Sequence, residues 1–295
     1  TGATFNNAGY LEIQNAQNMY DGTFNNSGVL TKTSAGTSAF NAESGAFNNS
    51  GTVNVLAGTL DVRRGGIDSG TFNMASGGVV SLTDGTDEFT AGGSVTGAGA
   101  VMLAGATLNV SGAVSASNID VFSGTLSGTG TMTVSGSFNE SGGNVNMVDL
   151  TVNGTLNWTG GTMSGAGTTT VGSGGALVIS GATNKYLEGP RVLTNRSAAG
   201  SSWSGTGYID AQSVTGATFN NAGYLEIQNA QNFYNVTLNN SGTLLKSSGG
   251  TSTFNSNDGT FNNSGTVEVL AGTLDLRRGG ADSGTFNLAS GGVVS

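Results

Sequence analysis

The acidic residues Asp84, Asp87 and Glu88 form the closest group in this sequence that could do acid–base or metal chemistry. Paired carboxylates serve glycoside hydrolysis, and regularly spaced ones bind calcium. The Asp-Gly-Thr-Asp-Glu spacing matches neither a calcium-binding loop nor a calcium-binding repeat, so we expect a solvated turn. The chain has no His and no Cys, which excludes imidazole and thiolate chemistry. We therefore predict no catalytic residues, no metal, no cofactor and no enzymatic activity.

Basic residues occur in two pairs that repeat. Arg63 and Arg64 return as Arg277 and Arg278, with aspartates near both pairs. They could contact an acidic partner, but we favour local charge pairing beside a turn.

Lys32 falls at an inward position of its repeat, and Lys246 is its copy. A buried lysine would need a partner, so we expect the strand to end one residue early and the lysine to leave at a corner.

Four aromatic residues are candidates for stacking on sugar rings. Tyr10 and its copy Tyr224 are expected to point outward from strands, and Trp158 and Trp203 stand among polar residues. Exposed aromatics on a surface are usually scattered singly, so binding to surface glycans is the weaker expectation.

The elements that carry these residues follow from a long repeat. Residues 1–81 align with residues 215–295 at a constant offset of 214, and 64 of the 81 positions are identical. We interpret residues 1–214 as one full period and residues 215–295 as the start of the next. A tandem array of this kind predicts one continuous solenoid over residues 1–295.

A shorter unit, Phe-Asn-Asn followed by Ala or Ser and Gly, recurs inside the long period about every 21 residues, the size of one solenoid coil. After each turn, apolar and polar residues alternate with period two, and no segment shows a helical stripe, so we predict an all-β chain. We expect like residues to stack inside and at the turns, coil upon coil. The ladder candidates are Phe5, Phe24, Phe47, Phe72, Asn6, Asn25, Asn48, Phe219, Phe261 and Phe286.

Composition agrees with an ordered β-protein. Gly accounts for 52 of 295 residues, Pro occurs once, and hydrophobic residues make up 36%. The net charge of −9 with only 9 Lys and Arg argues against a nucleic-acid partner. No apolar run is long enough to insert into a membrane. Neither terminal segment resembles a cap, so we expect the partner to be more of the same array, meeting the chain end to end or laterally.

Two segments carry a resemblance to a known class of proteins. Residues 47–62 (FNNSGTVNVLAGTLDV) and 156–168 (LNWTGGTMSGAGT) resemble repeats of giant bacterial surface proteins, namely filamentous-haemagglutinin-like adhesins and autotransporter passenger domains. The resemblance implies a right-handed parallel β-helix, export to the bacterial cell surface, and a role as an extracellular fibre or stalk in attachment or biofilm.

Three other functions stay open. A carbohydrate-binding or carbohydrate-active β-helix is the first alternative, although the charge clusters of such enzymes are missing. An ice-binding solenoid would need Thr-x-Thr ranks on successive coils, and the Thr pairs lie too far apart. A calcium-folded repeat is disfavoured by its missing motif.

Overall fold

The computed structural model describes residues 2–40, 44–212, 216–254 and 258–295. Its contacts divide the chain into two compact units. Unit 1 comprises Thr1–Phe138 and Gly143–Asp149, and unit 2 comprises Asn139–Gly142 and Leu150–Ser295. The described residues contain no helix, and their parallel strands form a β-solenoid of about 14 turns spaced about 20 residues apart. That the two units form one continuous solenoid stays a prediction of the repeat.

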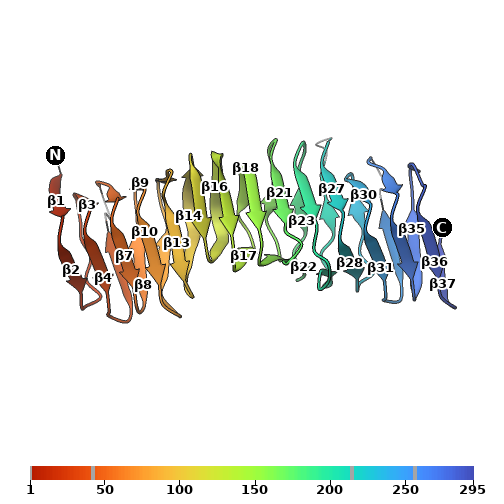
Figure 1. Cartoon of the computed structure of the whole chain (residues 1–295), viewed down its shortest axis with the longest axis horizontal. Coiled ribbons are helices and arrows are strands. Elements are labelled where there is room, and N and C mark those ends of the chain that lie inside the picture. Colours follow the sequence, from red (N-terminus) through yellow and green to blue (C-terminus); the bar gives the residue numbers. More distant parts are fainter. Residues whose placement is uncertain (1, 41–43, 213–215, 255–257) are drawn as a thin grey trace. The chain divides into compact units, whose positions relative to one another are not determined.

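Unit 1 is drawn in red to yellow-green in Figure 1, where its strand arrows lie side by side. Most coils contribute three strands, although residues 100–110 and 119–134 each form one long strand that runs through more than one strand position. Strands of successive coils pair in parallel. The strands are β1 (Ala3–Asn7), β2 (Tyr10–Ile13), β3 (Gly22–Asn26), β4 (Val29–Lys32), β5 (Thr37–Phe40), β6 (Phe47–Asn49), β7 (Thr52–Val55), β8 (Thr59–Val62), β9 (Gly66–Asp68), β10 (Thr71–Met74), β11 (Val79–Leu82), β12 (Thr86–Phe89), β13 (Ser94–Gly97), β14 (Ala100–Val110), β15 (Ala113–Ala116) and β16 (Ile119–Val134).

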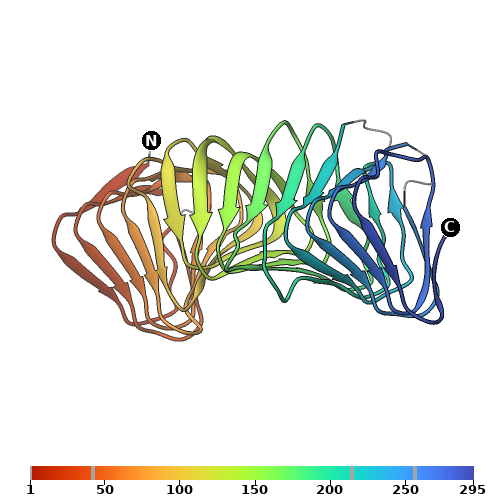
Figure 2. The ribbon, with the colours of Figure 1, turned by 45° about the vertical axis from the view of Figure 1, so that its right-hand side comes forward.

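Unit 2, green to blue in Figure 2, has the same organisation of three stacks of parallel strands. Two strands, β17 (Ser137–Glu140) and β18 (Asn144–Val152), contain residues of both units. The others are β19 (Thr155–Trp158), β20 (Thr162–Met163), β21 (Thr168–Val171), β22 (Ala176–Ile179), β23 (Lys185–Leu187), β24 (Val192–Asn195), β25 (Ser202–Trp203), β26 (Ile209–Asp210), β27 (Thr218–Asn221), β28 (Tyr224–Ile227), β29 (Phe233–Tyr234), β30 (Thr237–Asn240), β31 (Thr243–Lys246), β32 (Thr251–Phe254), β33 (Phe261–Asn263), β34 (Thr266–Val269), β35 (Gly272–Leu276), β36 (Thr285–Leu288) and β37 (Gly292–Val294).

Alternation along the strands separates the interior from the surface. In β7 the side chains of Val53 and Val55 are fully buried while Thr52 and Asn54 face outward, and β22 repeats this with Leu177 and Ile179. Burial of one apolar set per strand provides the main stabilisation of such a narrow interior.

The phenylalanine ladder runs through the first three coils of the repeat. Phe5, Phe24 and Phe47 occupy equivalent positions of β1, β3 and β6, and their rings stack with centroids 5.4 Å apart at both steps. In the second copy the same register holds Phe219, Leu238 and Phe261.

The ladder does not continue to Phe72 or Phe286, contrary to expectation. Phe72 lies in register with Val53, and its copy Phe286 with Val267. The position next to Phe47 belongs instead to Gly66, where a Cβ atom would collide with the carbonyl oxygen of Phe47. Gly66 has no side chain to fill the interior there, and the ring of Phe72 packs against Phe47 at 6.4 Å and against Phe89 at 5.5 Å.

Candidate functional site

Two rows of asparagine follow each other along the Phe-Asn-Asn strands. The inner row is buried, and its side-chain amides donate from one coil to the amide oxygen of the next at 2.8–3.0 Å, ending at Asn49 in unit 1 and at Asn263 in unit 2, which accept the last of these bonds. Its members also donate to backbone carbonyls, as Asn26 Nδ2 does to Thr52 O at 3.1 Å. Buried amides satisfied in this way fix the register of the coils. The inner row comprises Asn7, Asn26 and Asn49 in unit 1, and Asn195, Asn221, Asn240 and Asn263 in unit 2.

The outer row lies toward solvent and is bonded in the same way. Asn25 Nδ2 donates to Asn6 Oδ1 and Asn48 Nδ2 to Asn25 Oδ1, both at 2.8 Å. The copy in unit 2 joins Asn220, Asn239 and Asn262 at 2.9 and 2.7 Å. Both outer rows end on a backbone amide, that of Ile67 in unit 1 and that of Ala281 in unit 2.

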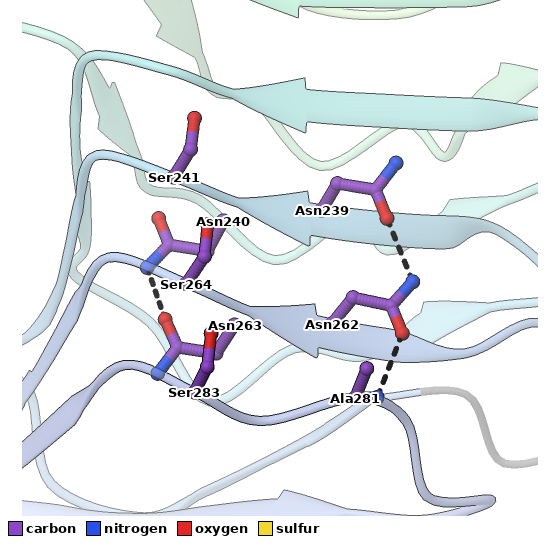
Figure 3. Close-up of a pocket in the computed structure, with 8 residues that line it drawn as sticks. All are labelled: Asn239, Asn240, Ser241, Asn262, Asn263, Ser264, Ala281 and Ser283. Atoms are coloured by element: carbon purple, nitrogen blue, oxygen red, sulfur yellow. Dashed lines mark hydrogen bonds between the residues drawn. The ribbon is translucent and has the colours of Figure 1, made fainter.

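A shallow groove of about 280 Å³ lies along these rows in unit 2. Figure 3 shows the two asparagine rows side by side, with serines at the ends of the strands. The groove offers amides and hydroxyls but no charged group, so it can hydrogen-bond but has no acid or base. The lining residues are Asn239, Asn240, Ser241, Asn262, Asn263, Ser264, Ala281 and Ser283.

The arginine pairs are engaged locally. Arg63 Nε lies 2.8 Å from Asp61 Oδ2, and Arg277 Nε repeats this distance to Asp275 Oδ2. Arg64 Nε lies 3.5 Å from Asp84 Oδ2, with both side chains about half exposed. Arg64 and its copy Arg278 have left-handed backbone conformations, with φ of 70° and 73°. The exposed pair of Arg64 and Asp84 contributes little energy.

The aromatic candidates divide into exposed and buried pairs. Tyr10 is 65% exposed on β2, and its copy Tyr224 is half-buried on β28. Burial, and secondarily the carboxylates of Glu226 and Glu268, raise the pKa of Tyr224. The expectation for the tryptophans was wrong: Trp158 and Trp203 are fully buried. Their polar neighbours in sequence are the outward residues of the same strands, so alternation places both indoles inside.

The lysines were also expected to leave the interior, and this was wrong. Lys32 and Lys246 end β4 and β31, and their side chains are 0% and 1% exposed. Lys246 Nζ donates to Asn229 O, Ser248 O and Ser248 Oγ, each at 2.9 Å. The loop carbonyls therefore satisfy the ammonium without any carboxylate, while burial lowers the pKa of both lysines.

The expectation of a solvated acidic turn was wrong for Asp87. It lies on β12 opposite Gly66 and is fully buried, and burial raises its pKa to about 7. Asp68, on the same inner face two residues beyond Gly66, is 1% exposed. Burial and the charge of Asp87 raise the pKa of Asp68, although the backbone N–H of Asn49 donates to its Oδ1 at 3.0 Å. Neither carboxyl group is accessible to a substrate.

The sequence patterns considered above did not indicate three half-buried tyrosines, namely Tyr186, Tyr208 and Tyr234. The rings of Tyr208 and Tyr234 meet edge to face with centroids 5.3 Å apart. Tyr186 and Tyr234 lie 48 residues apart, which is two coils of 24 residues, and that spacing could have identified them. Tyr208 lies two residues before the equivalent position of the coil between them, so no spacing indicates it.

The described residues contain no group of three or more His, Cys, Asp or Glu side chains arranged to hold a metal ion. Within the same residues, no helix is long and apolar enough to cross a membrane. Comparison of the chain with protein-family models, with curated proteins and with solved structures gave no match.

Proposed function

We propose that this chain is a structural and adhesive segment of a long extracellular bacterial fibre or stalk, in which the 214-residue period repeats along one solenoid. The observation that carries the proposal is the register at the two junctions of the repeat. A tandem array needs the repeated block to pair with the segment that follows it and with the segment that precedes it.

The first junction lies in unit 1, where the repeated block meets the residues after it. Strand β10 pairs with β13, with Phe72 opposite Val95, and β11 pairs with β14, with Val80 opposite Val101. Both pairings are parallel and free of register shifts, so the block passes into the rest of the period without a change of fold.

The second junction lies in unit 2, where the end of one period meets the start of the next. Strand β24 pairs with β27, with Leu193 opposite Phe219. Asn195 Nδ2 donates to Asn221 Oδ1 at 3.0 Å, so the inner asparagine row crosses the junction. The repeated block can therefore pair both with the segment that follows it and with the segment that precedes it, as an array of this period requires.

The polar, weakly charged surface suits a fibre in an aqueous exterior, and the partner that fits it best is more of the same array. A chain extended by one further period tests the fibre. Residues 82–214 and then residues 1–81 are appended after Ser295, and single particles are measured by electron microscopy. We expect each added period to lengthen the particle by about 50 Å, from about ten coils at ~4.8 Å each.

A control chain carries the same insert with its 133 non-repeated residues (82–214) in scrambled order. An extended chain that is no longer than the original, or that folds back on itself, would contradict the array. Antibodies against this chain, applied to intact cells of the source bacterium, test the surface location. Labelling only after lysis would overturn that part of the proposal.

A further inference from the structure

A cluster of tyrosines lies on the outer face of unit 2. Tyr186, Asp210 and Tyr234 occupy outward positions in register on β23, β26 and β29. Tyr208 precedes Asp210 by two residues and faces the same side. We call Tyr186, Tyr208, Asp210 and Tyr234 the tyrosine patch.

Contacts within the patch hold the rings in place. Tyr208 packs edge-on against Tyr234, with the ring centroids 5.3 Å apart. Asn232 Nδ2 donates to the hydroxyl of Tyr234 at 2.6 Å. The rings are thus oriented before any ligand arrives, which lowers the entropic cost of binding.

Asp210 brings a carboxylate into this aromatic surface. Its Oδ1 accepts from the backbone amide of Gln212 and from Asn235 Nδ2, both at 2.7 Å. The two donors fix the carboxylate beside the rings. The patch therefore combines aromatic surface, a fixed acceptor and amide groups.

The patch is assembled by residues from two successive periods. Tyr186, Tyr208 and Asp210 belong to the end of one period, whereas Tyr234 belongs to the start of the next. Tyr20 is the copy of Tyr234 in unit 1, and its hydroxyl accepts the equivalent hydrogen bond from Asn18. It is 57% exposed, and among the described residues no other tyrosine packs against it. Joining one period to the next therefore creates the patch.

We propose that the tyrosine patch binds a neutral saccharide. Sugar rings have apolar C–H faces that pack on aromatic rings, and their hydroxyl groups donate to carboxylates and amide oxygens. An acidic saccharide would be repelled by Asp210 and by a chain of net charge −9. If the periods repeat as proposed above, one patch arises at each junction, and several patches on one fibre would raise avidity.

Saturation-transfer NMR and titration calorimetry on the full chain test this inference. The probes are cellohexaose, maltohexaose and chitohexaose, with hexagalacturonate as the acidic comparison. We expect at least one neutral hexasaccharide to bind and hexagalacturonate not to bind. Tyr208→Ala and Asp210→Asn should each weaken binding about tenfold, the loss expected for one good contact.

Two variants separate recognition from folding. Tyr234→Phe keeps the ring and should retain the affinity to within about threefold. Tyr20→Ala removes the same residue of the first copy, outside the patch, and should leave the affinity unchanged. Absence of binding by every neutral probe, or equal weakening by Tyr20→Ala and Tyr208→Ala, would overturn the inference. Neither result would affect the lengthening expected of the extended chain, so the two proposals fail separately.

Discussion

Phe233 and Phe254 meet edge to face with their ring centroids 5.1 Å apart. In the first copy the same contact, also at 5.1 Å, joins Phe24 to Phe40. Phe40 and Phe254 are equivalent, but Phe24 is equivalent to Leu238, and Phe233 to Met19. The ring that packs against the equivalent residues Phe40 and Phe254 therefore comes from a different position of the repeat in each copy. Two substitutions have exchanged a ring and an aliphatic side chain while the interior stays filled.

This exchange predicts strong coupling between positions 233 and 238. Leu238→Phe alone should destabilise unit 2 by about 1 to 3 kcal/mol, because it adds a ring beside Phe233 in a filled interior. Adding Phe233→Met should recover most of that loss. Urea unfolding followed by the fluorescence emission of buried Trp203 measures both effects, because the ring centroids of Trp203 and Phe233 are 5.0 Å apart.

The reciprocal exchange is the matched control in unit 1. Phe24→Leu should destabilise the first copy, and adding Met19→Phe should restore part of the loss. If the single substitutions simply add in both copies, with an interaction below about 0.5 kcal/mol, the two positions are independent and the exchange has no packing basis.

The two asparagine rows should differ in their contribution to stability. Asn240 is 1% exposed, and its replacement by Ala leaves amide groups of Asn221 and Asn263 without their partner. We expect Asn240→Ala to lower the free energy of unfolding by about 2 to 3 kcal/mol, and Asn239→Ala, in the outer row, by less than about 1 kcal/mol. Tryptophan emission during urea unfolding reports both, and equal losses would show that burial does not set the value of these amides.

Period-two alternation and the recurring Phe-Asn-Asn motif were sufficient to predict an all-β solenoid with stacked coils. They also predicted which side chains point inward. Trp158 and Trp203 were misplaced only because their polar neighbours outweighed the alternation that holds for Val53 and Val55.

Contacts between coils could not be predicted in the same way, because the coil length varies. Hydrogen-bonded side chains on successive coils are 19 residues apart at Asn6 and Asn25, but 26 apart at Asn195 and Asn221. Each change of length shifts which residues are neighbours along the stack. Lys246 therefore reaches carbonyls that no sequence spacing indicates, and Tyr208 reaches Tyr234.

Lys185 should make unit 2 more stable as the pH rises from about 8 to 10. Its side chain is fully buried, and burial lowers its pKa to about 8. In that window the unfolded chain still holds a proton that the folded chain has lost, so raising the pH favours folding. Tryptophan-detected unfolding should show this rise in the native chain, and Lys185→Met should reduce it, leaving the part due to Lys246, whose pKa burial also lowers. A rise of undiminished size in the variant would contradict the assignment to Lys185.

Asp87 should have the opposite effect on unit 1 at acidic pH. Its pKa of about 7 in the folded chain lies above the ordinary value of 3.8. Between these values the folded chain keeps a proton that the unfolded chain has lost, so stability is greatest below pH 4 and falls as the pH rises. The slope should be about 1.4 kcal/mol per pH unit, levelling off above pH 7, and Asp68 adds to it in the same direction.

Hydrogen exchange of β9 and β12, corrected for intrinsic rates, measures this dependence where it arises. Asp87→Asn cannot ionise at this position, so it should reduce the slope by the contribution of Asp87 and leave the part due to Asp68. Asp84→Asn is the matched control, because that carboxylate is exposed and paired with Arg64, and it should keep the slope of the native chain. A native chain whose β9 and β12 become more protected between pH 4 and 7 would show that Asp87 is ionised in the fold, since only a charged carboxylate is favoured by rising pH.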